Sequence, residues 1–154
     1  LKKDNDKIGN IFCYGSLNNS IKNKNLKFSS GDLKIFSRTF DKMNRNIQLW
    51  LDKINFNKTH LILYGATAAA TNLFLNKKLN KSKIFICDSD RSKQKLYIEG
   101  FPNKITQIDS VLNKKKDFKI LILAKFYTKD IYQMLTKKYK IEKSKISMLS
   151  QFKK

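Results

Sequence analysis

The clearest pattern in the chain is a helical apolar stripe between residues 32 and 54. Apolar side chains recur there mostly at steps of three and four residues, which places them on one face of an α-helix. They are Leu33, Phe36, Phe40, Met43, Ile47, Trp50, Leu51 and Ile54. Asp32 stands just before them and is a good N-cap residue. The pattern predicts one long amphipathic helix over residues 32–54, with an aromatic face of the kind that packs into a core.

Short apolar runs farther along the chain predict β-strands. Residues 60–64, 83–87 and 119–123 are almost entirely apolar, which is typical of strands buried on both faces of a parallel sheet. Residues 146–149 predict a last strand. These runs are too short to cross a membrane, so we expect no membrane partner.

Helical and turn patterns separate these strands. Small residues over 66–75 predict a helix directly after the first strand, and Thr128 is expected to cap a helix that follows the third. Residues 104–110 are expected to add a short strand that leads into a helical turn near residues 111–112. Strands and helices therefore alternate. This order predicts an α/β fold, a three-layer Rossmann-like parallel sheet flanked by helices and preceded by the long helix.

The first 30 residues have a different character. They are polar and rich in Asn and Lys, apart from one apolar patch, Ile11–Tyr14, that predicts a single short strand. We therefore expect a polar N-terminal segment over residues 1–30 and one Rossmann-like domain over residues 31–154 that includes the long helix. The 154-residue chain starts with Leu rather than Met, so we expect it to be a piece of a longer protein.

Lysine accounts for a strong positive charge. The formal net charge is +21, and the chain contains 30 Lys but only 3 Arg, with no basic block longer than three residues. Lys, Asn and Ile are the residues that A- and T-rich codons encode. Genome composition therefore explains the excess better than a selected nucleic-acid surface, which usually recruits Arg. Nucleic acid is not an expected specific partner, although polyanions should bind in a salt-sensitive way.

Cysteine and histidine are too few for several kinds of site. Cys13 and Cys87 lie far apart and predict reduced thiols in a cytoplasmic protein, not a disulfide framework. His60 is the only histidine, so a structural zinc site with four nitrogen or sulfur ligands is excluded. A catalytic Cys13–His60 pair has no local support in the sequence.

The predicted topology gathers polar residues at one edge of the sheet. Ligands of open parallel sheets bind outside the carboxyl ends of the strands. Those ends are followed here by Gly65–Thr67, Asp88–Asp90 and Ala124–Tyr127. Free N–H groups at the start of the helix after Gly65 are expected to favour an anion, typically a phosphate.

The turn at Gly65 partly matches the dinucleotide fingerprint G-x-G-x-x-G/A. Gly65 and Ala70 fit its first and third positions, but Thr67 replaces the second glycine. Asp88 follows 23 residues after Gly65, about where the ribose-binding acid of such folds lies. The match favours a nucleotide-like ligand. The alternative is that Gly65 only permits a tight turn and that the small Ala residues only let the helix pack closely on the sheet.

Three stretches resemble one protein family. Residues 64–73 look like the Y-G-A-x-A-(K/A)-x-x-x-L-L turn in the C-terminal domain of S-adenosylmethionine-dependent sugar C-methyltransferases. Those enzymes act on nucleotide-linked deoxysugars in polysaccharide and antibiotic pathways. Residues 87–100 are similar to the family's V-D-D-N-P-x-K-x-G-x-Y-x-P-G stretch, and residues 121–127 stand where the family has a strand ending in W-N-Y. The resemblance covers most of the chain from Gly31 onward.

The chain departs from the family pattern at a few positions. Lys95 replaces Gly and Glu99 replaces Pro in the second stretch, and Lys125-Phe126 replace Trp-Asn in the third. The last of these changes leaves open whether the ligand site is intact.

The resemblance implies a domain that binds a nucleotide-linked sugar and is not catalytic alone. The family binds its methyl donor, and carries its catalytic His and Tyr, in a domain nearer the N-terminus, so no cofactor is expected here. By position, Gly65 to Thr67 would face the phosphates, Asp88 and Asp90 the sugar or ribose hydroxyls, and Tyr127 a ring or hydroxyl. The candidate binding residues are Tyr64, Gly65, Ala66, Thr67, Asp88, Asp90, Lys125 and Tyr127.

The expected partners are the nucleotide-linked sugar and the upstream S-adenosylmethionine-binding domain of the same parent chain. Without that domain, the stripe on the 32–54 helix predicts an exposed apolar patch along Phe36, Phe40, Met43 and Trp50, or a homodimer that covers it. Two alternatives stay open. One is a Rossmann-like module for NAD, CoA or a nucleotide sugar in another carbohydrate-biosynthesis enzyme, and the other is a basic nucleic-acid-associated protein.

Overall fold

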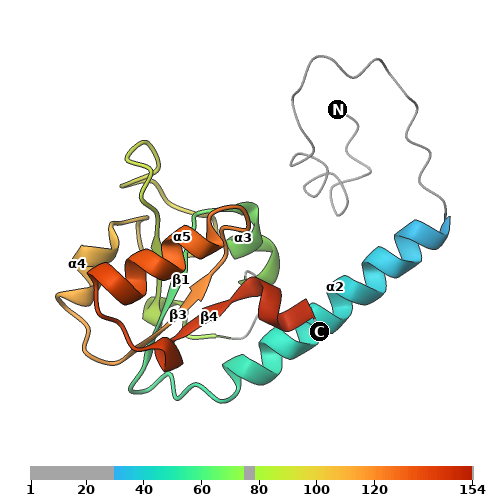
Figure 1. The fold of residues 1–154 in the computed structure, drawn as a ribbon, viewed down its shortest axis with the longest axis horizontal. Helices are drawn as coiled ribbons and strands as arrows, with labels where there is room; N and C mark the ends of the chain where they lie inside the picture. Colours follow the sequence, from blue (N-terminus) through green and yellow to red (C-terminus); the bar gives the residue numbers. More distant parts are fainter. Residues whose placement is uncertain (1–29, 75–78, 154) are drawn as a thin grey trace. The chain divides into compact units, whose positions relative to one another are not determined.

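The computed structural model describes residues 30–74 and 79–153 (Figure 1). The chain divides into two units, Leu1–Phe36 and Ser37–Lys154, and the sheet with its flanking helices belongs to the second. The strand predicted at Ile11–Tyr14 lies outside the described residues. Within the described ranges, no helix combines the length and the apolar character needed to cross a membrane.

A parallel four-stranded sheet forms the centre of the domain, in the order β2-β1-β3-β4 (Figure 1). The strands are β1 (His60–Tyr64), β2 (Ile84–Cys87), β3 (Phe118–Ile122) and β4 (Ile146–Met148). The predicted strands are thus confirmed with small shifts at their ends. Tyr64, the last residue of β1, pairs with Cys87 and with Ile122, so the carboxyl ends of the three neighbouring strands stand level.

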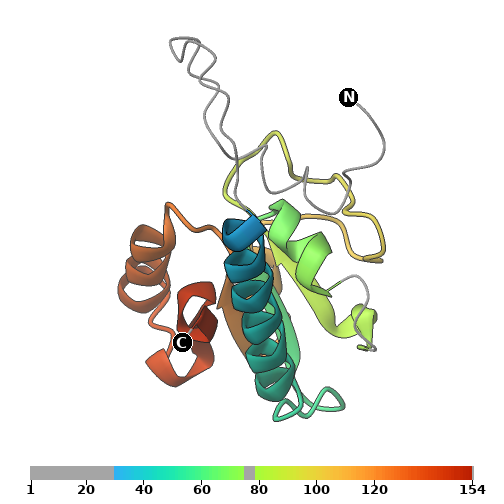
Figure 2. The ribbon, with the colours of Figure 1, turned by 90° about the vertical axis from the view of Figure 1, so that its right-hand side faces the viewer.

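Helices cover both faces of the sheet, which makes the three layers that the sequence predicts. One face carries α2 (Ser30–Leu51), α3 (Ala68–Phe74) and the 3₁₀-helix η5 (Leu149–Lys153), and the other α4 (Ile108–Leu112), α5 (Thr128–Gln133) and a π-helical turn η3 (Met134–Lys138). Figure 2 shows α3 and α5 on opposite sides. Short 3₁₀-helices η2 (Lys81–Lys83) and η4 (Lys143–Lys145) lead into β2 and β4.

Side-chain alternation along the strands explains why both faces are apolar. Leu61 and Leu63 point into the core cluster under α2 and α3, whereas Ile62 and Tyr64 point into the cluster under α4 and α5. All four are buried. β1 lies in the middle of the sheet, between β2 and β3, with apolar clusters on both of its faces.

The long helix packs on the sheet domain through its C-terminal half. Ile47 and Leu51 are fully buried, and Phe40, Met43 and Trp50 are partly buried against the same cluster. The Trp50 ring meets the Phe152 ring edge-on at 5.6 Å between centroids. These three side chains are therefore partly covered within the chain rather than forming a fully exposed patch, and the homodimer stays a prediction. The side chain of Phe36 lies outside the described residues.

Two local expectations were wrong. Residues 104–110 form no strand: only Thr106 bridges to Cys87, and α4 begins at Ile108. Thr128 is the first residue of α5 rather than its cap. Its hydroxyl donates to the carbonyl oxygens of Ala124 and Lys125, at 2.6 and 3.0 Å, and Tyr127 stands at the cap position.

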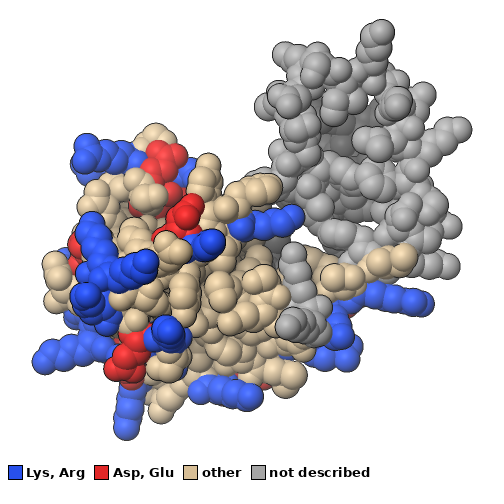
Figure 3. All heavy atoms as spheres, in the orientation of Figure 1, with Lys and Arg blue, Asp and Glu red and all other residues tan. Residues whose placement is uncertain are grey.

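Lysine side chains lie over aromatic rings at the borders of the core. Lys115 Nζ lies 5.6 Å from the centre of the Phe85 ring, Lys145 Nζ 5.2 Å from that of Phe118, and Lys81 Nζ 5.9 Å from that of Phe101. These are cation–π distances. Figure 3 shows basic side chains mainly around the edge of the visible face.

Gly65→Ala should destabilise the fold markedly. Gly65 is buried with φ +105°, and an added Cβ would lie 3.0 Å from both the amide nitrogen and the Cβ of Ala124. We expect a loss of about 2 kcal/mol or more in the free energy of unfolding, measured by urea denaturation. Gly100→Ala is the control, because Gly100 also has a positive φ (+77°) but is exposed. Equal losses in the two variants would contradict a role for the contact with Ala124.

Candidate functional site

The carboxyl ends of β1, β2 and β3 are tied together around Gly65. Gly65 N–H donates to the Cys87 carbonyl at 2.8 Å, and Leu123 N–H donates to the Tyr64 carbonyl at 2.8 Å. The helix after β1 lies on one face of the sheet and the helix after β2 on the other. The point between β1 and β3 is therefore the topological switch point, where ligands of such sheets bind.

Asp88 braces the turn that follows β1. Its Oδ2 accepts the Ala66 N–H at 2.8 Å and the Lys93 ammonium at 3.3 Å, and its Oδ1 accepts the Asp90 N–H at 2.9 Å. Only 12% of the side chain is exposed. The structure thus brings the predicted residues Gly65, Ala66 and Asp88 together, with the carboxylate directed at the backbone of the turn.

Asp90 is the more accessible carboxylate, with 47% of its side chain exposed. Its Oδ1 accepts the backbone N–H and the hydroxyl of Ser92 at 2.9 and 2.7 Å. These two hydrogen bonds lower the pKa of Asp90, so it stays charged at neutral pH. Lys93 Nζ lies 4.0 Å from its other oxygen. Asp90 therefore keeps that oxygen available to a hydroxyl donor.

The expectation of free N–H groups at the start of α3 is wrong for three residues. The Ala66 N–H is taken by Asp88, the Thr67 N–H donates to the Gly65 carbonyl at 2.9 Å, and the Ala70 N–H to the Thr67 carbonyl at 2.9 Å. The Thr67 hydroxyl is buried and has no hydrogen-bond partner among the described residues. A carboxylate already stands where the sequence suggested a phosphate.

Tyr64 lies in the core under α4 and α5 and is only 3% exposed. Burial is the main cause that raises the pKa of its phenol, with the Cys87 thiol adding to the shift. Cys87 is itself buried and free, and burial raises its thiol pKa to about 12. Both groups are therefore protonated at neutral pH, and Cys87 is a structural thiol rather than a nucleophile.

The loop after β3 presents exposed aromatic side chains. Phe126 is 77% and Tyr127 66% exposed, and the Lys125 ammonium lies 5.6 Å from the centre of the Phe126 ring. The hydroxyl of Thr128 fixes the loop through the Ala124 and Lys125 carbonyls. Rings held in this way are suited to stacking on a flat or apolar ligand group.

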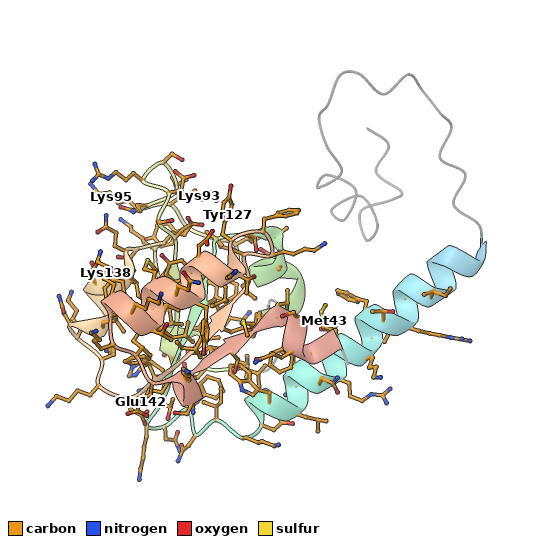
Figure 4. The ribbon with its side chains drawn as sticks, viewed as in Figure 1. Met43, Lys93, Lys95, Tyr127, Lys138 and Glu142 are labelled. Atoms are coloured by element: carbon orange, nitrogen blue, oxygen red, sulfur yellow. The ribbon has the colours of Figure 1, made fainter. Side chains whose placement is uncertain are left out.

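Sequence reasoning missed Lys93, which joins Asp88 and Asp90. The signal was present, because Lys93 falls on the Lys of the V-D-D-N-P-x-K stretch. Lys95 adopts φ +69° at the Gly position of that stretch, which shows why a glycine suits it. Figure 4 shows Lys93, Lys95 and Tyr127 at one end of the domain and Glu142 at the opposite end.

His60 stands at the amino end of β1, away from this site. Its pKa is lowered, first by burial and also by Lys115 and Lys83, so it is neutral at pH 7. Cys13, its suggested partner, lies outside the described residues. In the described part of the chain, no three His, Cys, Asp or Glu side chains form a group that could hold a metal ion.

Comparison with known families gives one result. Residues 22–148 match the family model described as the C-methyltransferase C-terminal domain. The searches of curated proteins and of solved structures returned no match. The matched range contains α2, the whole sheet and all three loops of the candidate site.

Asp88→Ala should destabilise the domain, because it leaves the partly buried Ala66 N–H without its acceptor. We expect a loss of about 1–3 kcal/mol in the free energy of unfolding, measured by thermal or urea denaturation. Asp90→Ala is the control, since Asp90 caps only its own exposed turn. If Asp88→Ala were no less stable than Asp90→Ala, the carboxylate would not be the brace of the turn.

Proposed function

The chain belongs to the C-methyltransferase C-terminal domain family, and from this membership we propose that it holds the nucleotide-linked sugar that such an enzyme methylates. The observation that carries the proposal is the convergence of three loops at the switch point of the sheet. The Ala66–Asp88 hydrogen bond of 2.8 Å joins the first two loops, and the close approach of Gly65 to Ala124 joins the third.

The chemistry of these loops suits a hydroxylated, anionic ligand with a flat base. Asp90 offers a charged oxygen to sugar or ribose hydroxyls, as carboxylates do in many nucleotide sites. The exposed rings of Phe126 and Tyr127 offer stacking surfaces. Lys93 and Lys125 supply positive charge beside them. Sugar hydroxyls, base and phosphates thus each have a complementary group.

The Gly65–Thr67 turn supports a nucleotide ligand less than the loops around it do. With the N–H groups of Ala66 and Thr67 bonded within the chain, and the Asp88 carboxylate beside them, a pyrophosphate there would meet negative charge and few donors. The turn therefore does not suit the pyrophosphate of NAD. We propose that Gly65–Thr67 serves the site through its shape and that the phosphates lie over the lysines.

S-adenosylmethionine supplies the methyl group of the proposed reaction and is assigned to another domain of the parent enzyme. The thiol of Cys87, at the end of β2, is buried and protonated and so offers no activated nucleophile for methyl transfer. We propose that this domain binds and orients the sugar and does not transfer the methyl group alone. The proposed setting is polysaccharide biosynthesis in the cytoplasm.

Calorimetry on this chain at moderate salt tests the proposal. The probes are UDP-, dTDP-, GDP- and CDP-linked hexoses, with NAD, coenzyme A, S-adenosylmethionine and a short single-stranded DNA as comparisons. A ligand at a hundred times its dissociation constant should stabilise the fold by about 2.7 kcal/mol, which a thermal shift detects. Binding of NAD or coenzyme A without any nucleotide sugar would favour the other Rossmann-type modules. Binding of DNA alone, lost as salt rises, would leave the charge as the only source of affinity.

Asp90→Asn should weaken binding of the nucleotide sugar identified in this way about five- to tenfold while leaving the fold intact. The amide keeps an oxygen for the Ser92 donors, so the local turn survives, but the negative charge offered to hydroxyls is lost. Glu142→Gln is the matched control, an equally neutralised exposed acid at the opposite end of the domain (Figure 4). Unchanged affinity in Asp90→Asn would remove Asp90 from the site.

A further inference from the structure

The loop after β2 holds one residue in a conformation that its side chain disfavours. Lys95 has φ +69°, one of two described non-glycine residues with a positive φ; the other is Lys140, with φ +55°. Lys140 directly follows the last helical turn of η3, where Ile141 N–H donates back to the Leu135 carbonyl at 3.0 Å. A left-handed residue is ordinary at such a helix end. Lys95 likewise closes a run of turns, in which the Lys93 N–H donates to the Asp90 carbonyl and the Leu96 N–H to the Lys93 carbonyl, both at 3.2 Å. Lys95 differs in standing where the resembling family pattern has glycine, the residue that adopts this conformation at least cost.

Hydrogen bonds and packing hold the Lys95 backbone in place. The Lys95 N–H donates to the Ile105 carbonyl at 2.9 Å, and the Ile105 N–H donates to the Leu96 carbonyl at 2.8 Å. Ile105 and Phe101 are buried in the core cluster under α2 and α3, which anchors the far side of the loop. The base of the loop is therefore closed on itself, and the direction in which the Lys95 side chain leaves it is fixed.

The charges of this loop leave Lys95 without a counter-charge. Lys93 lies 3.3 Å from Asp88 and 4.0 Å from Asp90, so the two carboxylates of the loop share one ammonium. Lys95 is exposed, and within the described residues its ammonium forms no ion pair or hydrogen bond. Arg91 is exposed on the same loop. It is one of only three Arg in the sequence, which contains 30 Lys. The loop thus offers cations that nothing in the described structure neutralises.

We propose that Lys95 contacts the diphosphate of the nucleotide sugar, with Arg91 as a second cation on the same loop. This inference rests on the proposed function and specifies which group of the ligand the loop recognises. It accounts for a strained Lys at a position where glycine would fit without strain, because glycine would offer the ligand no charge. It also supplies the phosphate contacts that the Gly65–Thr67 turn, with its bonded N–H groups, does not.

The test compares nucleoside diphosphates with the matching nucleosides, UDP with uridine and dTDP with thymidine, by calorimetry. Lys95→Asn removes the charge and keeps a residue type that tolerates the left-handed region. Lys95→Arg keeps both charge and strain. Lys140→Asn is the matched control, because it removes an exposed Lys of the same conformation elsewhere in the domain. Lys95→Gly serves as a second neutral variant if melting shows that Asn disturbs the loop.

We expect Lys95→Asn to weaken binding of the nucleoside diphosphate about five- to tenfold, to leave nucleoside binding unchanged, and to reduce the salt dependence of diphosphate binding. Lys95→Arg and Lys140→Asn should bind as the unmodified chain does. If the chain binds a nucleotide sugar and Lys95→Asn binds it equally well, the inference is overturned while the proposed function stands. Equal losses in Lys95→Asn and Lys140→Asn would overturn it as well, by showing a general charge effect. If the unmodified chain binds no nucleotide, the proposed function itself fails.

Discussion

The hydrogen bond between Ala66 N–H and the Asp88 carboxylate is the interaction on which the rest of the site depends. It joins the end of β1 to the end of β2 at 2.8 Å and fixes the path of the chain from Gly65 into α3. The same carboxylate holds the start of the next loop through the Asp90 N–H at 2.9 Å. One side chain that water barely reaches therefore links two loops that are far apart in the sequence, in addition to the backbone hydrogen bond from Gly65 to Cys87.

This brace changes how the domain can recognise a nucleotide. In dinucleotide-binding sheets the turn after the first strand meets the pyrophosphate with free backbone donors. Here an internal carboxylate uses such a donor, so negative charge stands where the ligand's negative charge would otherwise lie. Under the proposed function, recognition of phosphate would have to come from side chains, such as the exposed cations on the loop after β2. The fold resembles that of dinucleotide-binding domains, but the proposed means of binding differs.

Much of the fold could be predicted from the sequence because the strands have a clear apolar pattern. Runs such as 60–64 and 119–123 are apolar at nearly every position, which is typical of strands in a parallel sheet that helices cover on both faces. The strand predicted at residues 104–110 was wrong because their pattern is less distinct. Such a pattern does not distinguish a single bridging residue from a full strand. At the site, the sequence placed Gly65, Asp88 and Asp90 together from topology alone. It could not show that Asp88 turns inward to Ala66, because the partner of a side chain is decided by three-dimensional distance rather than by spacing along the chain.

The lysines that lie over Phe85, Phe118 and Phe101 have a consequence for how this sequence can change over time. A lysine side chain at such a border can cover apolar surface with its aliphatic part while its charge stays in water. A gene biased toward adenine would generate lysine readily, and at these positions the bias supplies hydrophobic cover as well as charge. Asparagine is a single base change away and equally favoured by that bias, yet it lacks the long aliphatic part. Mutational drift between lysine and asparagine is therefore asymmetric at these borders, and selection for stability would retain lysine there even where its charge has no use.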